Sequence, residues 1–206
     1  MAATASKRRT QEQRRAESER QIIRAARELF ARQGYTRTTL NDVGSAAGYT
    51  GGLVTHRFGS KEGLLNAVVD SSARRFAEDQ VQTAIKDKTA TEAMTTYLAV
   101  YLREINKRES HMRALYVIMG EALGSVPEIR KKIAAFNKGF RFRIAAMVQN
   151  GVDSGEFNPN IDTEAAALMI LALLRGVTMQ ILADRRAFDI EQVIPMVQQQ
   201  VLAGLR

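Results

Sequence analysis

The chain contains no cysteine, no tryptophan and only two histidines among its 206 residues. Without cysteine it has no disulfide framework and no thiolate metal site, a composition that suits the reducing cytosol. His56 and His111 fall in different predicted helices with no carboxylate at ligand spacing, so we expect no metal and no cofactor. We expect His111 at the surface. No glycine-rich phosphate loop follows a strand and no nucleophile motif occurs, so the sequence does not predict an enzyme.

Signals for export or membrane insertion are also missing. The basic amino terminus is followed by no apolar stretch of signal length. Residues 165–182 are mostly apolar, but Arg175 stands in their middle, where a charge would be costly in lipid. We therefore expect a buried helix there, no membrane partner and a cytoplasmic location.

Strand-like alternation of apolar and polar residues is absent, and apolar residues recur instead at helical spacing. The sequence therefore predicts an all-α protein. Its net charge of +8 is unevenly spread: residues 1–60 hold 11 Lys and Arg against 5 Asp and Glu, whereas residues 61–206 hold 19 against 17. An excess of positive charge near the amino terminus suits the neutralisation of nucleic-acid phosphates.

Two short helices separated by a tight turn are predicted between residues 39 and 58. Thr39 can cap the first helix, Gly48 can adopt the left-handed conformation that ends it, and Thr50 can cap the second. This is the helix-turn-helix plan, whose second helix enters the major groove of DNA. An ordinary helical hairpin is the alternative. However, the short second helix carries Gly51 and Gly52, which cost about 1 kcal/mol each against alanine unless the backbone must approach a partner closely.

Further spaced residues fall in one register over residues 18–66. They are Gly34, Tyr35, Thr38, Thr39, Asp42, Val43, Ala47, Gly48, Gly52, His56, Phe58, Ser60, Lys61, Glu62, Leu64 and Leu65. This pattern resembles the amino-terminal domain of the TetR family (TetR/AcrR-like) of bacterial transcriptional regulators. The sequence departs from the family at Gly44, where alanine is usual, at Tyr49-Thr50, where valine-serine is commoner, and at Thr55, where a phosphate-contacting tyrosine is typical.

The resemblance and the outward placement of the second helix together predict the DNA contacts. We expect them from Arg37, Thr39, Thr50, Gly51, Gly52, Leu53, Thr55, His56 and Lys61. Lys61 stands in the first turn of the next helix, where backbone N–H groups favour anions, so we expect it to contact a phosphate.

The predicted organisation has three parts. Residues 1–16 form a basic, flexible tail that is either disordered or an arm lying along phosphates or in the minor groove. Residues 17–60 form a three-helix DNA-binding domain whose first helix starts at Glu17. Residues 61–206 form a larger helical bundle for effector binding and dimerisation. Within it, helices are predicted to start at Thr91, at the capping box of residues 125–128, at Thr163 and at Asp189, and one is predicted to end at Gly151.

Large, adaptable apolar side chains are concentrated in the middle helices of the bundle. Most such residues belong to a core, but as a group they allow a mainly apolar pocket with a few hydroxyls. The family resemblance implies a small effector at this place, and no motif identifies it. The candidate lining residues are Met112, Tyr116, Met119, Phe136, Phe140 and Met147.

The helix from Thr163 is apolar on nearly all sides and therefore needs cover on nearly all sides. We predict that the last two helices form a four-helix bundle with a second copy of the chain. The alternative is that both helices complete the core of one chain. The predicted interface residues are Leu168, Leu171, Val193, Val197 and Val201.

The predicted function is sequence-specific binding of double-stranded operator DNA by a homodimeric repressor that a small apolar effector releases. A same-fold activator, or a sensor of a partner protein, is the nearer alternative. An all-α interaction module or enzyme is the more distant one.

Overall fold

The computed structural model describes residues 10–76, 81–107, 109–124, 126–186 and 188–206. Every regular element in these ranges is a helix, which confirms the predicted all-α class. The elements are α1 (Gln11–Gln33), α2 (Leu40–Ala47), α3 (Gly51–Phe58), α4 (Lys61–Phe76), α5 (Thr83–Ile85), α6 (Ala90–Lys107), α7 (Glu109–Leu123), the 3-10 turn η2 (Pro127–Ile129), α8 (Arg130–Asp153), α9 (Thr163–Ala183) and α10 (Ile190–Leu205).

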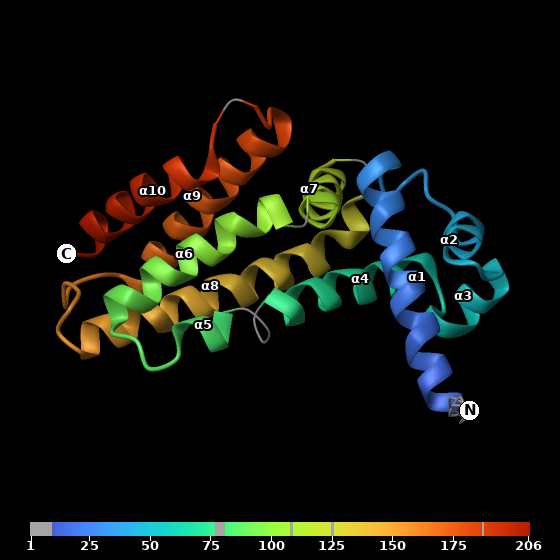
Figure 1. Ribbon diagram of the computed structural model, residues 1–206, viewed down its shortest axis with the longest axis horizontal. Coiled ribbons are helices and arrows are strands. Elements are labelled where there is room, and N and C mark those ends of the chain that lie inside the picture. Colours follow the sequence, from blue (N-terminus) through green and yellow to red (C-terminus); the bar gives the residue numbers. More distant parts are fainter. Residues whose placement is uncertain (1–9, 77–80, 108, 125, 187) are drawn as a thin grey trace, which may run out of the picture.

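The helices form a small group at one end of the molecule and an elongated bundle at the other (Figure 1). The small group contains α1, α2 and α3, and the bundle is built mainly from α6, α8, α9 and α10. α4 leads from the small group into the bundle, while α7 lies at the junction and packs against α1. Buried apolar residues of both parts belong to one continuous core, so the junction is packed and not a loose linker.

α1 begins at Gln11 and not at Glu17, so the predicted start of the first helix is wrong. Thr10 and Gln13 form a reciprocal capping box: the Gln13 N–H donates to Thr10 Oγ1 at 3.1 Å, and the Thr10 N–H donates to Gln13 Oε1 at 3.0 Å. This cap satisfies two backbone donors and starts the helix earlier than its first apolar residue. Residues 11–16 of the predicted tail are therefore helical, and residues 1–9 lie outside the described ranges.

Two other predicted helix boundaries also differ from the structure. α6 is capped by Thr89, which accepts from the Glu92 N–H at 3.3 Å, so Thr91 lies inside the helix. α8 runs past Gly151 to Asp153. Gly151 instead makes room for Phe157, because an added Cβ would lie 2.0 Å from the ring of that residue.

The predicted capping box before α8 includes Ser125, which lies outside the described residues. The described residues that follow form the 3-10 turn η2, and neither Val126 before η2 nor Ile129 before α8 provides a side-chain cap. The predicted starts of the last two helices are confirmed. Asp162 caps α9, and Asp189 caps α10 by accepting from the Glu191 N–H at 3.0 Å.

Glu156 holds the first turn of α6 from the loop that follows α8. Its carboxylate accepts from the Ala90 N–H at 2.8 Å and the Thr91 N–H at 3.0 Å, and these hydrogen bonds lower the pKa of Glu156 to about 2. Because the folded pKa lies below the ordinary value of 4.5, the stabilisation is complete above pH 4.5 and is lost as the pH falls towards about 2.

We predict that Glu156→Gln lowers the free energy of unfolding at neutral pH, and that this difference from wild type shrinks as the pH falls from 4.5 towards about 2. Denaturant unfolding at a series of pH values measures it. Glu164→Gln, on the exposed side of α9, is the control and should show no such convergence. A difference independent of pH would contradict the role of the carboxylate.

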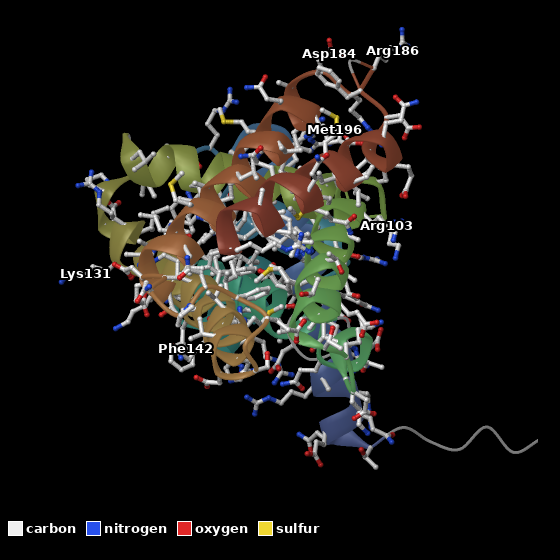
Figure 2. All side chains as sticks on the ribbon, turned by 90° about the vertical axis from the view of Figure 1, so that its left-hand side faces the viewer. Arg103, Lys131, Phe142, Asp184, Arg186 and Met196 are labelled. Carbon is white, nitrogen blue, oxygen red and sulfur yellow. The ribbon has the colours of Figure 1, made fainter. Side chains whose placement is uncertain are left out.

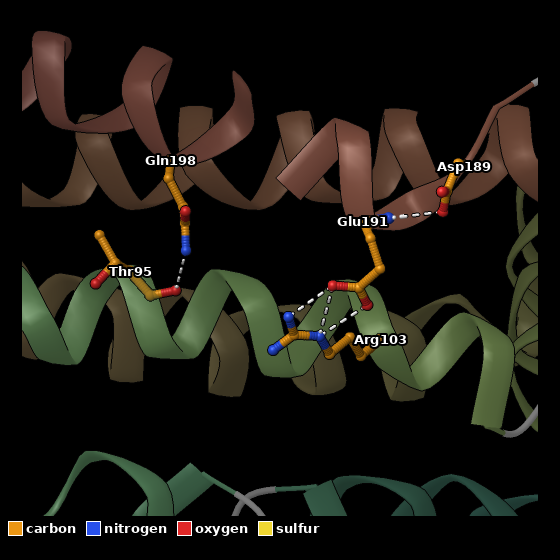
Figure 3. A network of polar contacts seen from close by, with 5 residues as sticks. All are labelled: Thr95, Arg103, Asp189, Glu191 and Gln198. Atoms are coloured by element: carbon orange, nitrogen blue, oxygen red, sulfur yellow. Dashed lines mark hydrogen bonds and ion pairs between the residues drawn. The ribbon is translucent and has the colours of Figure 1, made fainter. Parts of the chain in front are cut away.

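Polar contacts with α6 fix the rotation of α10 about its own helix axis. The Arg103 guanidinium pairs with both carboxylate oxygens of Glu191 at 2.6 to 3.2 Å, and Gln198 Nε2 donates to the Thr95 carbonyl at 2.9 Å (Figure 3). This rotation turns Val197 (5% exposed) and Val201 (6%) into the core of the same chain.

Three of the five predicted interface residues are therefore not on the outer surface. Leu171, Val197 and Val201 are buried within the chain, Val193 is half-buried and only Leu168 is well exposed. The four-residue repeat of valines in α10 reflects its packing on α6, which the sequence could not distinguish from packing on a second copy.

α9 nevertheless leaves a broad apolar side uncovered. Only 33% of the most apolar 18-residue window in Thr163–Ala183 is buried, although its length and hydropathy would suffice to cross a membrane. The residues of the uncovered side are Ala165, Leu168, Met169, Ala172, Gly176 and Met179, which repeat at three- and four-residue spacing. Phe188 and Met196 add exposed apolar side chains before and on α10, and Met196 is labelled at the surface in Figure 2.

Candidate nucleic-acid interface and regulatory site

The helix-turn-helix is built by the three local signals that the sequence contains. Thr39 Oγ1 accepts from the Asp42 N–H at 3.1 Å, and the Asp42 carboxylate accepts from the Thr39 N–H at 2.8 Å. Gly48 ends α2 in the left-handed conformation with φ of 78°. Thr50 Oγ1 then accepts from the Leu53 N–H at 3.2 Å and starts α3. The predicted pair of helices and its caps are confirmed.

α2 and α3 approach each other so closely that a glycine is required at position 44. A Cβ on Gly44 would lie 2.7 Å from the Gly51 nitrogen, which is backbone and cannot move aside. A Cβ on Gly51 would lie 1.9 Å from Asn41 Oδ1. Gly44 is a departure from the family pattern, and this contact explains it. Gly51 is half-buried, so a substitution there disturbs packing as well as any contact with DNA.

Gly44→Ala and Gly52→Ala should differ sharply in their effects on stability and on DNA affinity. Gly44→Ala forces α2 and α3 apart, which we expect to cost about 1 to 3 kcal/mol of stability and at least tenfold in DNA affinity. Gly52→Ala meets only Thr50 Oγ1 at 3.8 Å, so it should fold as well as wild type. Thermal unfolding and fluorescence anisotropy with labelled operator DNA measure the two effects. Full DNA binding by Gly44→Ala would contradict the close approach.

The predicted DNA-contact residues lie on α3 and at its cap, in the turn before α2 and at the cap of α2, and at the start of α4. Arg37, Thr39, Thr50, Gly52, Thr55 and His56 are exposed, whereas Gly51, Leu53 and Lys61 are half-buried. Two of the side chains also have local partners: Thr55 Oγ1 donates to the Gly51 carbonyl at 3.1 Å, and Arg37 Nε donates to the Gln33 carbonyl at 2.9 Å. The surface can therefore present hydroxyls, an imidazole and a guanidinium to DNA.

Lys61 has an intramolecular role that the sequence did not predict. Its Nζ donates to the Thr36 carbonyl at 2.9 Å and lies 4.4 Å from the centre of the Tyr35 ring. Burial is the largest influence on its ammonium group and lowers the pKa of Lys61. Lys61 thus ties the start of α4 to the turn after α1, and its contact with a phosphate stays a prediction.

A cationic cleft between α1 and α3 enlarges the candidate interface. Its volume is about 630 Å³, and its lining includes Arg14 and Arg15 of α1 and Arg57 of α3. Arg57 Nε is buried without a hydrogen-bond partner. Arg57 is not among the DNA contacts predicted from the sequence, because its place beside α1 depends on how the two helices pack.

Glu121 of α7 holds the turn between α1 and α2 from the other side. Its carboxylate accepts from the Tyr35 N–H at 2.7 Å and the Thr36 N–H at 3.1 Å. The turn is tight against this carboxylate: Gly34 has φ of 84°, and an added Cβ would lie 2.9 Å from Glu121 Oε1. Hydrogen bonds to Glu121 therefore join α7 to the turn that precedes the helix-turn-helix, and a hydrogen bond from Lys61 joins α4 to the same turn.

Part of the predicted effector site comes together inside the bundle. The Phe136 and Phe140 rings of α8 lie 5.0 Å apart between centres, and the Phe140 ring lies 6.2 Å from that of Tyr101 on α6. The Tyr116 hydroxyl of α7 donates to the Arg175 carbonyl of α9 at 3.2 Å. Four helices therefore meet at this aromatic cluster. Met112, Met119 and Met147 are buried or half-buried in the same core.

His111 does not lie at the surface, which corrects the prediction. Its side chain is buried, with 9% exposure, in α7. Arg143 and Arg175 are likewise not among the site residues predicted from the sequence. The signal available for Arg175 was its position in the middle of an apolar helix, where a charge is costly unless it has a role.

A helix-turn-helix with an exposed second helix, braced by α1 and joined through a packed junction to a helical body, defines a DNA-binding transcriptional regulator. The sequence matches two family models: bacterial regulatory proteins of the tetR family over residues 22–68, and the carboxy-terminal part of BetI-type transcriptional repressors over residues 90–206. The chain belongs to the TetR family of transcriptional regulators.

Relatives and solved structures agree with this assignment. The chain is 26% identical over 187 residues to the fatty acid metabolism regulator protein of Bacillus subtilis, covering 90% of this chain and 94% of the relative. It resembles the structure of the fatty acid degradation regulator FadR from Bacillus halodurans with a TM-score of 0.82 and 23% identity, over 97% and 99% of the two chains. It also resembles FadR from Bacillus subtilis in complex with stearoyl-CoA, with a TM-score of 0.81 and 21% identity, over 91% and 99% of the chains.

Proposed function

We propose that the protein is a cytoplasmic, homodimeric repressor that binds operator DNA through α2 and α3 of each subunit and leaves it when a small effector binds inside the bundle. The observation that carries this proposal is the pair of contacts with the turn before α2. There, hydrogen bonds of Glu121 of α7 and Lys61 of α4 join the bundle to the DNA-binding end. A ligand among α6, α7, α8 and α9 would act on α7 directly. The effector is expected to have an apolar part, since the cluster around Phe140 is mainly aromatic.

The dimer is proposed to form through the uncovered side of α9 and the outer side of α10. Met169 (69% exposed), Met179 (63%) and Met196 (69%) are large apolar side chains that a lone chain leaves in water. A two-fold arrangement of these helices would cover them and place two copies of α3 for two half-sites of an operator. The residues that support the interface are thus the outward ones and not the inward valines.

Titration of labelled DNA from the region flanking the coding sequence tests the proposal. We expect specific binding that weakens with salt, and release when an effector found by thermal-shift screening is added. Operator and effector should then weaken each other's binding by the same factor, typically corresponding to about 1–3 kcal/mol. Equal effector affinity with and without operator DNA would contradict the regulatory part. Absence of specific DNA binding would contradict the whole proposal.

A further inference from the structure

Two arginines from different helices converge on one aromatic ring inside the bundle. The Arg143 guanidinium of α8 lies 4.9 Å from the centre of the Phe140 ring, and that of Arg175 of α9 lies 6.0 Å from it. Both arginines are half-buried. Among the described residues, neither forms an ion pair with a carboxylate. Exposed arginines of the same bundle do, as Arg103 does with Glu191.

Two tyrosine hydroxyls lie near these guanidinium groups: that of Tyr101 is hydrogen-bonded to Arg175, and that of Tyr97 is within the influence of both charges. Burial raises the pKa of Tyr101, while the positive charge of Arg175 and its hydrogen bond oppose that rise. The pKa of Tyr97 is also raised by burial, against the charges of Arg143 and Arg175. These hydroxyls therefore keep their protons at neutral pH and supply no negative charge. The cluster is positive and rich in donors.

A half-buried pair of cations without a carboxylate partner is less favourable than the same pair joined by an anion. Arg175 Nε is buried without a hydrogen-bond partner. A buried donor without an acceptor costs free energy, and a cation without a counter-charge costs more. An anionic oxygen here would supply the acceptor that Arg175 Nε lacks, and the aromatic rings of Phe136 and Phe140 would cover an adjoining apolar chain.

We propose that the effector is an amphipathic anion, whose carboxylate or phosphate is bound by Arg143 and Arg175 and whose hydrocarbon part lies against the aromatic cluster. This inference rests on the proposed function, because it names the ligand class of the same regulatory site. It adds a charged head group to the apolar effector that the methionines and aromatic residues predict.

Three probes with one hydrocarbon chain and different head groups test the charge requirement in the wild-type protein. They are dodecanoate, dodecyl phosphate and dodecanol, each titrated calorimetrically below its micelle concentration. We expect at least one anionic probe to bind about ten- to a hundredfold more tightly than dodecanol, the range expected when charged hydrogen bonds are added. The comparison of dodecanoate with dodecyl phosphate decides which head group is preferred. Equal binding of all three, or binding by none, would overturn the proposal.

Variants then locate the anion site. Arg143→Gln and Arg175→Gln should each remove most of the preference for the anionic probe while leaving dodecanol binding unchanged. Arg141→Gln is the matched control. Arg141 is also a half-buried arginine of α8, but it is not one of the two arginines at the Phe140 ring. If Arg175→Gln folds poorly, Arg175→Lys takes its place in the test. Because lysine keeps the positive charge, this variant should keep part of the preference for the anionic probe. An unchanged preference in the folded Arg143→Gln and Arg175→Gln variants would overturn the assignment.

Operator release separates this inference from the proposed function. Release of operator DNA by dodecanol as readily as by the anionic probes, in wild type and in both glutamine variants, would support a repressor and overturn the anion site. Conversely, arginine-dependent binding of an anionic probe that leaves the operator complex intact would support the anion site and contradict its role in repression.

Discussion

Ala172→Glu combined with Met179→Glu should convert the protein into a monomer with little affinity for operator DNA. Both residues are exposed in the single chain and lie on the uncovered side of α9, so the substitutions leave the monomer core intact. In the proposed dimer they would bury unpaired carboxylates, a change that costs several kcal/mol and should raise the dimer dissociation constant at least about a hundredfold. Sedimentation velocity measures the oligomeric state.

The loss of operator affinity in this variant has a separate cause. A monomer can occupy only one half-site, and it therefore loses the gain of about 10² to 10⁴ in affinity that a second linked contact provides. Phe142→Glu is the matched control, because Phe142 is 69% exposed on α8 and lies on the surface away from Met196 in Figure 2. It should remain a dimer. An intact dimer in the double variant would refute the proposed interface.

Glu121→Ala should uncouple the effector from DNA. The substitution removes the acceptor of the Tyr35 and Thr36 N–H groups, so α7 no longer holds the turn before α2. We expect the effector to bind with unchanged affinity, while its effect on operator affinity falls from a typical coupling of about 1–3 kcal/mol towards zero. Effector titration of the operator complex by fluorescence anisotropy measures this coupling.

Glu109→Ala is the control for this prediction. Glu109 also lies on α7 and is paired, with Arg113 and Arg185, but within the bundle and not with the DNA-binding end. The control should lose surface ion pairs, which contribute little, and keep full coupling. If Glu121→Ala kept the coupling of wild type, transmission would have to run through the packing of α7 on α1 or through α4, where Lys132 of α8 pairs with Asp70 at 2.6 Å.

The helix-turn-helix could be predicted in detail because its signals are local. Thr39, Gly48 and Thr50 act within four residues of the backbone groups that they satisfy, so the sequence contains the whole cause. The start of α1 differs from the predicted one although the Thr10-Gln13 capping box is equally local, because the apolar spacing that predicts this helix begins several residues after the cap.

Features that depend on distant partners could not be predicted in this way. Val197 and Val201 are apolar and regularly spaced, yet only the position of α6 decides that they face inward. In the sequence, nothing distinguishes Glu121 from the other charged residues of α7. The fold brings its carboxylate to the N–H of Tyr35, which lies 86 residues earlier in the chain. Arg143 and Phe140 are near in sequence, but Arg175 reaches the same ring only through the packing of α9 on α8.

The contact between Gly34 and Glu121 also restricts how the sequence can change over time. A side chain at position 34 would collide with the carboxylate at 2.9 Å, and the left-handed backbone there already disfavours other residues. Loss of the carboxylate at position 121 would free the space but leave two N–H groups of the turn without an acceptor. Related proteins that keep this turn should therefore keep both glycine at position 34 and an acceptor at position 121, although the two positions lie far apart in the chain.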